Sequence, residues 1–353
     1  MSKKVLLAMS GGVDSSVSAF LLKEEGYEVI GVTLDLLDMS CRIENPQTCC
    51  SISAFSDAKD VADRIGIKHY ILDCKDVFKK EVINYFLDEY MLGRTPNPCI
   101  VCNSKIKFNI LLKKARELDA AYIATGHYAR IRKEYGRFVL RKAQDARRDQ
   151  SYFLYQLSLD QLSHSIMPLG DYRKEEVRKI AASLNLKVHN KQDSQEICFI
   201  PDGDYRDFIR KNLSEIEPGP ILDKEGNVLG EHKGIYLYTI GQRKGLGIST
   251  KKPLYVIRID SLRNAIIVGE REETTSQSLV AKDLNLISIE VIVGEMKVMA
   301  KVRHQHKEAE ATISPLKNGR VKVCFKEPQK AITPGQSVVF YENDRVIGGG
   351  VIE

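Results

Sequence analysis

The first 200 residues alternate between short apolar runs and longer segments in which apolar residues recur every three or four positions. Short, wholly apolar runs are typical of buried strands, and the longer spacing is typical of helices that bury one face. The expected strands cover residues 5–9, 28–34, 69–72 and 121–125, and the expected helices begin near residue 13 and cover about 54–65, 77–91 and 104–118. Strands separated by helices predict an α/β domain with a parallel sheet, which binds ligands beyond the carboxyl ends of its strands.

The pattern changes after about residue 201. A helix is expected over residues 204–213, and Pro218-Gly219-Pro220 then interrupts the chain. Short β segments follow, at residues 235–240, 254–259, 265–268, 286–293, 297–302, 309–313, 320–325, 337–341 and 346–352. Short strands at close spacing are typical of a small barrel or sandwich. The sequence therefore predicts an α/β domain (residues 1–202), a small middle module (203–275) and a C-terminal all-β barrel (276–353).

The composition narrows the class of protein. Of the 353 residues, 43% are apolar and 28% are charged, an ordinary globular composition that excludes a disordered or fibrous protein. No apolar run approaches the ~20 residues that a membrane-spanning helix needs. The apolar run after Lys4 stops at Ser10, so we expect a first strand rather than a signal peptide, no membrane association and a cytoplasmic location. The eight cysteines would then be reduced, which favours catalysis or metal binding over a disulfide scaffold.

Basic residues are concentrated between residues 130 and 148. This segment holds eight lysines and arginines against two acidic residues, so its charge equals the +6 of the whole chain. Such a run is most often the solvated face of a β-hairpin. The alternative is a patch that contacts the phosphates of a nucleic acid.

The strongest local signal is Ser10-Gly11-Gly12-Val13-Asp14-Ser15-Ser16, between the first expected strand and the first expected helix. Glycines let backbone N–H groups approach a phosphate, a helix N-terminus favours negative charge, and serine hydroxyls add donors. The Gly-Lys-Ser/Thr ending of a Walker A loop is missing, and so is the Gly-x-Gly-x-x-Gly pattern of dinucleotide-binding loops. Asp14 would repel a phosphate unless Mg²⁺ intervenes or the carboxylate caps the helix.

Three cysteines lie in segments that suit chemistry. Cys99 and Cys102 have the Cys-x-x-Cys spacing before an expected helix, where a helix N-terminus favours the thiolate, and Cys198 lies far along the chain. The three are compatible with an incomplete zinc site or with a [4Fe–4S] cluster that keeps one open iron. Alternatively, Cys102 and Cys198 form a thiol pair in which one carries persulfide sulfur and the other resolves it as a disulfide.

The other cysteines have a simpler interpretation, because buried cysteines are common small hydrophobic residues. We expect that role for Cys74 and Cys324, which lie in apolar strand contexts. Cys41, Cys49 and Cys50 lie in a polar loop, where a structural role is favoured.

The loop of residues 10–16 resembles the pyrophosphatase loop of the N-type ATP pyrophosphatases, which cleave ATP between its α and β phosphates and adenylate an oxygen. With the cysteine motifs, the whole chain is similar to the bacterial tRNA-specific 2-thiouridylases, which place sulfur on C2 of the wobble uridine of the anticodon. The matching strings are Ser10–Ser16, Thr95-Pro96-Asn97-Pro98, Cys102-Asn103, Ile106-Lys107-Phe108, Thr125-Gly126-His127-Tyr128, Asp149-Gln150-Ser151-Tyr152-Phe153-Leu154, Asp193-Ser194-Gln195-Glu196-Ile197-Cys198-Phe199-Ile200, Gly241-Gln242-Arg243-Lys244-Gly245-Leu246-Gly247 and Thr333-Pro334-Gly335-Gln336.

The resemblance implies a fold, cofactors and partners. The first domain would have the fold of the adenine-nucleotide hydrolases, and ATP and Mg²⁺ would be the cofactors. The partners would be the anticodon stem-loop of tRNA and a sulfur donor such as a cysteine desulfurase or a sulfur-relay protein.

Carried over position by position, the resemblance also assigns roles to residues. ATP would contact Ala8, Met9, Ser10, Gly11, Gly12, Val13, Asp14 and Ser15, with Leu34 and Gly126 beside the adenine. The target base would contact Asn97, Pro98 and position 99, and the tRNA would contact His127, Arg148, Asp149, Gln150, Arg303, His304 and Gln336. Cys198 would bear the persulfide, and Cys102 would release its sulfur by forming a disulfide with Cys198.

Position 99 departs from the pattern of this family, which usually has Asp where this chain has Cys99. A carboxylate suits acid–base chemistry or the orientation of a base, whereas a thiol suits metal ligation. Related tRNA thiolases of the superfamily hold a [4Fe–4S] cluster on three cysteines, so Cys99, Cys102 and Cys198 are the metal ligands if a cluster is present. The cluster and persulfide interpretations both stay open at this point.

Two other functions compete with a sulfurtransferase. An adenylating amidotransferase or ligase of the same superfamily would not need Cys102 or Cys198. A non-catalytic, ATP-responsive RNA-binding protein would bind tRNA without releasing AMP. We expect the sulfurtransferase, because a loop for ATP and chemically suited thiols occur together.

Overall fold

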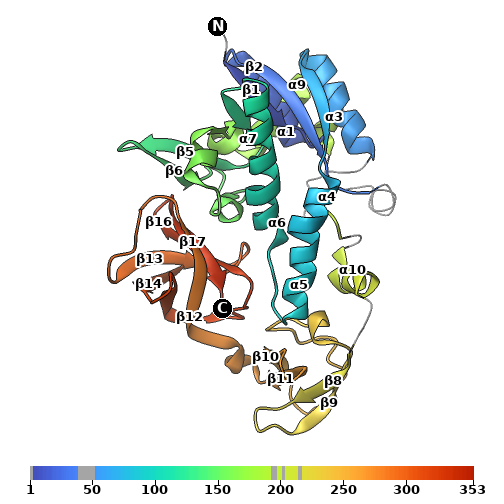
Figure 1. The fold of residues 1–353 in the computed structure, drawn as a ribbon, viewed down its shortest axis with the longest axis vertical. Coiled ribbons are helices and arrows are strands. Elements are labelled where there is room, and N and C mark those ends of the chain that lie inside the picture. Colours follow the sequence, from blue (N-terminus) through green and yellow to red (C-terminus); the bar gives the residue numbers. More distant parts are fainter. Residues whose placement is uncertain (1–2, 39–51, 192–196, 201–202, 214–216) are drawn as a thin grey trace. The chain divides into compact units, whose positions relative to one another are not determined.

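The computed structural model describes residues 3–38, 52–191, 197–200, 203–213 and 217–353 (Figure 1). Within these residues the chain forms two compact units. The first unit contains the chain up to Val82, Cys99–Gly203 and Asp344–Val346, and the second contains Ile83–Pro98, Asp204–Asn343 and Ile347–Glu353. Both units are therefore built from segments that are not contiguous in the sequence.

A parallel sheet forms the centre of the first unit (Figure 1). Its strands are β1 (Lys4–Ala8), β2 (Glu28–Asp35), β3 (Lys68–Asp73), β4 (Tyr122–Ala124) and β7 (Ser165–Ile166), in the spatial order β3-β2-β1-β4-β7. The central strand β1 buries Val5, Leu6 and Leu7 completely, which is the continuous apolar pattern of a strand covered on both faces. The predicted α/β domain with a parallel sheet is confirmed.

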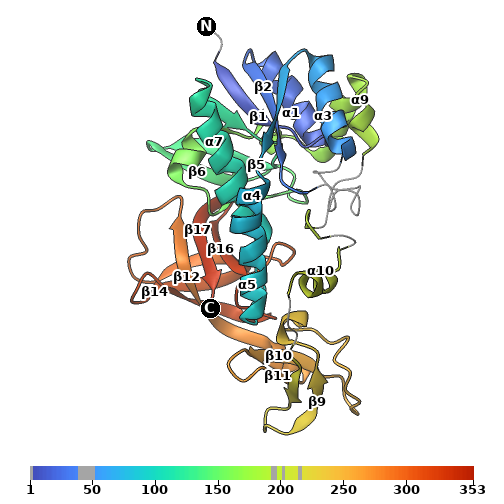
Figure 2. The same ribbon diagram turned by 45° about the vertical axis from the view of Figure 1, so that its right-hand side comes forward.

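Helices cover both faces of this sheet (Figure 2). Helices α1 (Val13–Glu24), α3 (Ile52–Ile65) and α9 (Lys174–Ser183) share one apolar cluster with β1, in which Val17 and Leu22 gather with Ala58 and Val177. Helix α7 (Phe108–Glu117) packs on β1 and β4 and buries Phe108, Leu111 and Leu112. Among the described residues, none of the helices combines the length and apolar character that crossing a bilayer requires.

Two of the predicted helices contain a wider π turn. In the region expected as one helix over 77–91, α4 (Lys75–Phe78) is followed by a π-helix at Lys79–Asn84 and by α5 (Tyr85–Met91). Similarly, α6 (Pro98–Val101) leads into a π-helix at Cys102–Lys107 before α7 begins. Single π turns within helices are rare and are frequent at functional sites. The spacing of apolar residues does not distinguish them from an α-helix.

The basic segment 130–148 contains a hairpin of β5 (Ala129–Glu134) and β6 (Arg137–Lys142). Its arginines form ion pairs within the first unit, among them Arg130 with Asp344 at 2.9 Å, Arg132 with Asp171 at 2.6 Å and Arg141 with Glu134 at 2.6 Å. Two of these partners lie outside the segment, so the local charge excess of the sequence is partly neutralised in the fold. This supports the hairpin interpretation over a continuous phosphate-contacting patch.

The second unit holds two β structures. A small sheet consists of β8 (Gly219–Leu222), β9 (Val228–His232), β10 (Tyr255–Asp260) and β11 (Ala265–Gly269), in the order β10-β11-β8-β9. The strands of the second structure are β12 (Thr275–Leu286), β13 (Met296–Lys301), β14 (Ala309–Pro315), β15 (Val321–Lys330), β16 (Ser337–Glu342) and β17 (Arg345–Ile352). Their order is β12-β15-β14-β13-β16-β17, and the pairing of Ala281 with Ile352 closes them into the predicted C-terminal barrel. Helices α5 and α10 (Tyr205–Asn212) also belong to this unit.

Two of the strand predictions are wrong. Residues 235–240 were expected as a strand, but Ile235–Leu237 form a 3₁₀ turn after Gly234, whose φ is +120°. This segment is buried, and a short buried apolar run has the same pattern in a strand and in a helical turn. Residues 287–293 are irregular, and the strand of this region is β12, which ends at Leu286. Its first four residues are polar and exposed, so they carry no apolar alternation.

Candidate active site

The predicted phosphate loop connects β1 to α1. Gly11 has φ +66°, and a Cβ there would lie 2.2 Å from a backbone carbonyl oxygen of α3, so only glycine fits. Gly12 caps α1 with extended backbone and without a side-chain hydrogen bond. The hydroxyls of Ser15 and Ser16 are buried and donate to the carbonyl oxygen of Gly12 at 3.2 and 2.8 Å. These two hydroxyls therefore stabilise the loop itself, whereas Ser10 is exposed.

The carboxylate of Asp14, in the first turn of α1, is neutralised by the protein. The ammonium of Lys174, at the start of α9, lies 2.8 and 2.7 Å from its two oxygens, and the hydroxyl of Tyr128 donates to Oδ1 at 2.7 Å. Only 8% of the Lys174 side chain is exposed. The sequence predicts that Mg²⁺ or helix capping offsets the negative charge of Asp14. In the structure, the ammonium of Lys174 offsets it. No motif points to this lysine, which lies 160 residues away along the chain.

A second lysine that the sequence motifs missed also reaches the loop. Lys191 follows a 3₁₀ turn at Lys187–Asn190. Its Nζ donates to the carbonyl oxygen of Gly11 at 3.1 Å and to Oδ2 of Asp57, in α3, at 2.6 Å. Charge next to the phosphate loop therefore comes from two lysines of the same sequence region, each paired with an aspartate.

Leu34 and Gly126 lie at the carboxyl edge of the sheet, on both sides of β1. Strand β1 pairs in parallel with β2, which contains Leu34, and with β4, which ends two residues before Gly126. A Cβ at Gly126 would lie 2.9 Å from the backbone nitrogen of Ser15 and 3.0 Å from the carbonyl carbon of Asp14. Gly126 therefore lets the end of β4 approach the first turn of α1. Its contact with adenine stays a prediction.

The three cysteines with predicted chemistry all belong to the first unit. Cys99 is exposed in α6, Cys102 is buried at the first position of the π turn, and Cys198 is partly buried. The residue after Cys198, Phe199, contacts the ring of Phe78 with centroids 5.8 Å apart, which anchors this end of the segment. Residues 193–196, the first part of the same motif, lie outside the described residues.

The remaining cysteines are less suited to chemistry. Burial, with a smaller contribution from Asp73 and Asp35, raises the pKa of the Cys74 thiol to about 11, so it stays protonated and weakly nucleophilic. This supports a packing role for Cys74. Cys324 is partly buried in β15. The residues Cys41, Cys49 and Cys50 lie outside the described part of the chain.

The described side chains are not grouped as a metal site. No three His, Cys, Asp or Glu side chains of the described residues are grouped to hold a metal ion. Cys99, Cys102 and Cys198 are all described, and they are not among such a group in this structure. Asp14 is already engaged by Lys174, so the loop offers no ready carboxylate for Mg²⁺ either. No step of the reaction is therefore assigned to a cluster.

Asn97 and Pro98 belong to a loop of the second unit that Gln336 fastens to the barrel. Nε2 of Gln336 donates to the carbonyl oxygens of Thr95 at 2.8 Å and Pro96 at 3.2 Å. The structure thus brings Gln336 next to the predicted base-contacting loop, although 240 residues separate Gln336 from Pro96. The amide nitrogen of Gln336 holds this loop in place.

Arg303 and His304 follow β13, also in the second unit. Arg303 donates to the carbonyl oxygen of Ala331 at 3.0 Å and to the hydroxyl of Thr333. Since Thr333 lies three residues before Gln336, the structure gathers Arg303 and Gln336 around one turn. His304, the next residue along the chain, is partly buried.

Residues 148–150 lie close to Tyr128 in the first unit. The side-chain oxygen of Gln150 accepts a hydrogen bond from the backbone N–H of Tyr128 at 2.8 Å. The carboxylate of Asp149 accepts hydrogen bonds from the backbone of Ala143 at 3.0 Å and the hydroxyl of Ser151 at 2.7 Å. Arg148 is exposed. Asp149 and Gln150 therefore shape the turn, and Arg148 is the side chain best placed to meet a ligand.

His127 is a neutral histidine. Burial, and to a lesser extent the charge of Lys107, lowers its pKa to about 3. Its Nδ1 lies 2.8 Å from the hydroxyl of Thr125, and its ring packs against Phe108 with centroids 5.8 Å apart. A contact of His127 with tRNA would therefore use hydrogen bonding or stacking, because the ring carries no charge at neutral pH.

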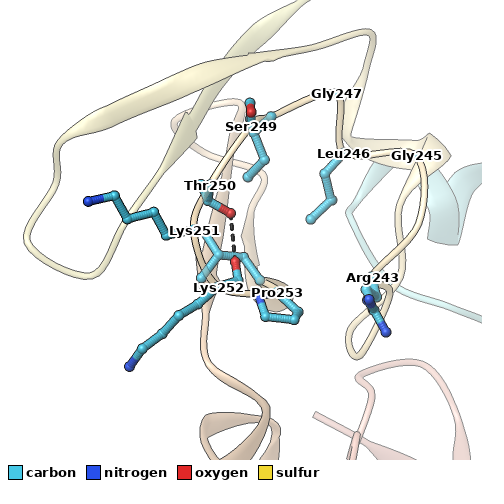
Figure 3. Close-up of a pocket in the computed structure, with 11 residues that line it drawn as sticks. Arg243, Gly245, Leu246, Gly247, Ser249, Thr250, Lys251, Lys252 and Pro253 are labelled. Carbon is cyan, nitrogen blue, oxygen red and sulfur yellow. Dashed lines mark hydrogen bonds between the residues drawn. The ribbon is translucent and has the colours of Figure 1, made fainter.

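A cavity of about 420 Å³ lies in the loop 243–254 of the second unit (Figure 3). The loop is held by a hydrogen bond from the hydroxyl of Thr250 to the carbonyl oxygen of Lys252 at 2.6 Å. Figure 3 shows the ammonium groups of Lys251 and Lys252 directed away from the loop, with Arg243 on its opposite side. None of the predicted catalytic residues lines this cavity, and its basic side chains suit contact with phosphates.

Family models match most of the chain. The tRNA methyl transferase HUP domain matches residues 3–202, the tRNA methyl transferase PRC-barrel domain matches residues 206–270, and the aminomethyltransferase beta-barrel domain matches residues 276–352. These matches define the class of protein: its chain has a HUP domain, followed by a PRC-barrel domain and a β-barrel domain.

Curated relatives match the full length. A tRNA-specific 2-thiouridylase of Thermoanaerobacter pseudethanolicus is 54% identical over 359 residues, which cover 100% of this chain and 98% of the relative. One from Clostridium botulinum strain Okra is 52% identical over 355 residues, with 100% of both chains covered. The chain belongs to the family of the tRNA-specific 2-thiouridylases.

Solved structures give a weaker likeness. The NMN synthetase of Francisella tularensis is 13% identical, with a TM-score of 0.36, and the match covers 59% of this chain and 72% of the synthetase. These values are too low to bear on the function.

Proposed function

We propose that this chain uses ATP to replace O2 of the wobble uridine of tRNA anticodons by sulfur. The observation that carries the proposal is the 52% identity over the whole chain to relatives named tRNA-specific 2-thiouridylases. Two features of the first unit support it, the loop at the start of α1 and the cysteines Cys102 and Cys198. The reaction needs both, since a carbonyl oxygen leaves only after activation and the sulfur needs a carrier.

In the first step, the triphosphate of ATP binds to the loop Ser10–Ser16, with adenine beside Leu34 and Gly126. Backbone N–H groups and the positive end of α1 stabilise the phosphates, and Mg²⁺ bound to ATP would neutralise further phosphate charge. O2 of the uridine, turned out of the single-stranded anticodon loop, attacks the α-phosphorus. The bond from the α-phosphorus to the bridging oxygen breaks, which yields an O2-adenylated uridine and pyrophosphate.

In the second step, a sulfur donor first leaves a persulfide on Cys198. The thiolate of Cys102 attacks Sγ of Cys198, so a disulfide between the two cysteines forms and hydrosulfide leaves. Hydrosulfide attacks C2 of the adenylated uridine, the C2–O2 bond breaks, and AMP carries the oxygen away. An external dithiol then reduces the disulfide for the next cycle. Cys99 carries no sulfur in this route, and with Asn97 and Pro98 it contacts the target base.

We further propose which residues hold the tRNA. Asn97 and Pro98 contact the target base, and His127, Arg148, Asp149, Gln150, Arg303, His304 and Gln336 contact the rest of the anticodon stem-loop. Residues 203–275 act as a module that contacts tRNA, between the catalytic segment 1–202 and the barrel segment 276–353. The exposed Arg148 and the hydrogen bonds of Gln336 to the loop before Asn97 support these roles.

The test uses the full chain with tRNA, ATP and a sulfur donor, and measures 2-thiouridine in digested tRNA by mass spectrometry. We expect Cys198→Ala and Cys102→Ala to abolish 2-thiouridine while tRNA-dependent release of pyrophosphate continues. Cys324→Ala, in the barrel strand β15, is the matched control and keeps activity. Full activity of Cys198→Ala would refute the persulfide route, and no release of pyrophosphate by the unsubstituted chain would refute adenylation.

A further inference from the structure

Two lysines contact the phosphate loop, and they differ in how accessible they are. Lys174 contacts both oxygens of Asp14 and exposes 8% of its side chain. Lys191 contacts the carbonyl oxygen of Gly11 and one oxygen of Asp57, and it exposes 33% of its side chain. An ammonium has three N–H donors, so the two described contacts of Lys191 use two of them. Lys191 therefore combines contact with the loop and access to solvent.

We propose that Lys191 binds the β- and γ-phosphates of ATP and stabilises pyrophosphate as it leaves. This rests on the proposed use of ATP by the loop Ser10–Ser16. Loops of the Walker A type carry a lysine within the motif that reaches the same two phosphates. The loop of this protein has no lysine, and Lys191 supplies the cation from 180 residues further along the chain.

The charge change in the reaction explains why a cation belongs there. When the bond between the α-phosphorus and the bridging oxygen breaks, negative charge accumulates on the departing pyrophosphate. A cation already in place at that position stabilises the transition state more than the ground state. The pairing of Lys191 with Asp57 keeps the ammonium beside Gly11, so little reorientation is required when the triphosphate binds.

Lys187 offers a comparison that tests whether Lys191 has a purely structural role. Lys187, four residues earlier, also pairs with α3, with its Nζ 3.5 Å from Asp60, and exposes 85% of its side chain. Lys187 thus joins the same segment to the same helix, but the structure describes no contact between it and the loop. If tethering to α3 were the only task of Lys191, substitution of either lysine would have similar consequences.

The experiment measures binding of ATP, AMP and inorganic pyrophosphate to the full chain by calorimetry, for the unsubstituted protein, Lys191→Met, Lys191→Arg and Lys187→Met. Loss of a charge-assisted hydrogen bond predicts ATP and pyrophosphate affinities about 10–100-fold weaker in Lys191→Met. AMP affinity stays unchanged, because AMP lacks the two outer phosphates. Lys191→Arg keeps part of the ATP affinity, and Lys187→Met keeps all of it.

The outcomes separate this inference from the proposed function. Equal weakening of ATP and AMP binding in Lys191→Met would mean a structural role, and an unchanged ATP affinity would mean no phosphate contact; either result overturns the inference alone. If the unsubstituted chain bound no ATP, the proposed function and the inference would both fall. Thermal unfolding of Lys191→Met and Lys187→Met shows whether either substitution damages the fold.

Discussion

The ammonium nitrogen of Lys174 lies 2.8 and 2.7 Å from the two carboxylate oxygens of Asp14. Asp14 stands in the first turn of α1, where the N–H groups of the helix also favour negative charge. Without a counter-ion, however, the carboxylate would repel any phosphate bound at the same helix end. The pair therefore leaves the loop neutral at this position and the helix dipole available to the ligand.

Removal of Lys174 should destabilise the protein and weaken ATP binding. In Lys174→Met the carboxylate of Asp14 loses its partner, and breaking a buried ion pair costs about 3–5 kcal/mol. Since 29% of the Asp14 side chain is exposed, we expect a loss of about 2–4 kcal/mol in the free energy of unfolding. Urea denaturation measures the loss, and ATP calorimetry measures the added repulsion.

The double variant Lys174→Met/Asp14→Asn is the control for this pair, because it removes both charges. It should recover most of the stability and of the ATP affinity that Lys174→Met loses. A double variant as weak as the single one would show that packing of Lys174, rather than its charge, is what the loop needs.

His127 should make stability depend on pH. Burial lowers its pKa from the ordinary value of 6.5 to about 3, so the unfolded chain binds a proton below pH 6.5 that the folded chain does not bind until about pH 3. This contribution to stability is therefore complete above pH 6.5 and falls as the pH decreases, by about 1.4 kcal/mol per pH unit. Urea denaturation at pH 7 and pH 5 measures the slope. His127→Gln should lower the slope of stability against pH by the contribution of about one proton. An unaltered slope would contradict the lowered pKa of His127.

Alkylation should separate the cysteines by reactivity. At pH 8 the Cys74 thiol, with its pKa raised to about 11, is almost wholly protonated and buried, whereas Cys99 is exposed. Because the thiolate is the nucleophile, iodoacetamide should label Cys99 long before Cys74. Peptide mass spectrometry over time measures both. Early labelling of Cys74 would show that the burial around it opens in solution.

The loop 243–254 should contribute to the salt dependence of tRNA binding. Each phosphate contact that is lost lowers the slope of log affinity against log salt by about 0.7–0.9. We expect that decrease in Lys251→Gln and in Arg243→Gln. Lys326→Gln is the control, since Lys326 lies in the barrel and pairs with Glu310 at 2.8 Å. Equal slopes in all three variants would exclude this loop from the tRNA interface.

Local sequence patterns predict much of the fold and only part of the site. The order of strands and helices up to residue 125 and the barrel strands after Met296 follow from apolar spacing, and the turn between β1 and α1 follows from its glycines. Lys174 and Lys191 could not be predicted, because ordinary surface-type lysines become significant only through contacts with residues 160 and 180 positions away.

For the charged segment 130–148, the sequence suggests more charge than the fold presents. Its basic excess is plain in the sequence, but Asp344 and Asp171 neutralise Arg130 and Arg132 in the fold. Net charge counted along a chain therefore overestimates the charge that a ligand meets. The closing of the barrel, in contrast, depends on the pairing of Ala281 with Ile352, which no local pattern reveals.

The two units are interleaved along the chain, and this has a consequence for synthesis. Asp344 is the partner of Arg130 in the first unit, although more than two hundred residues separate them. A nascent chain that has emerged only as far as residue 202 contains the hairpin and the partners of Arg132 and Arg141, but not Asp344, the partner of Arg130. The first unit is therefore completed only after residues 344–346 have left the ribosome, and a stop before residue 344 would remove residues from both units at once.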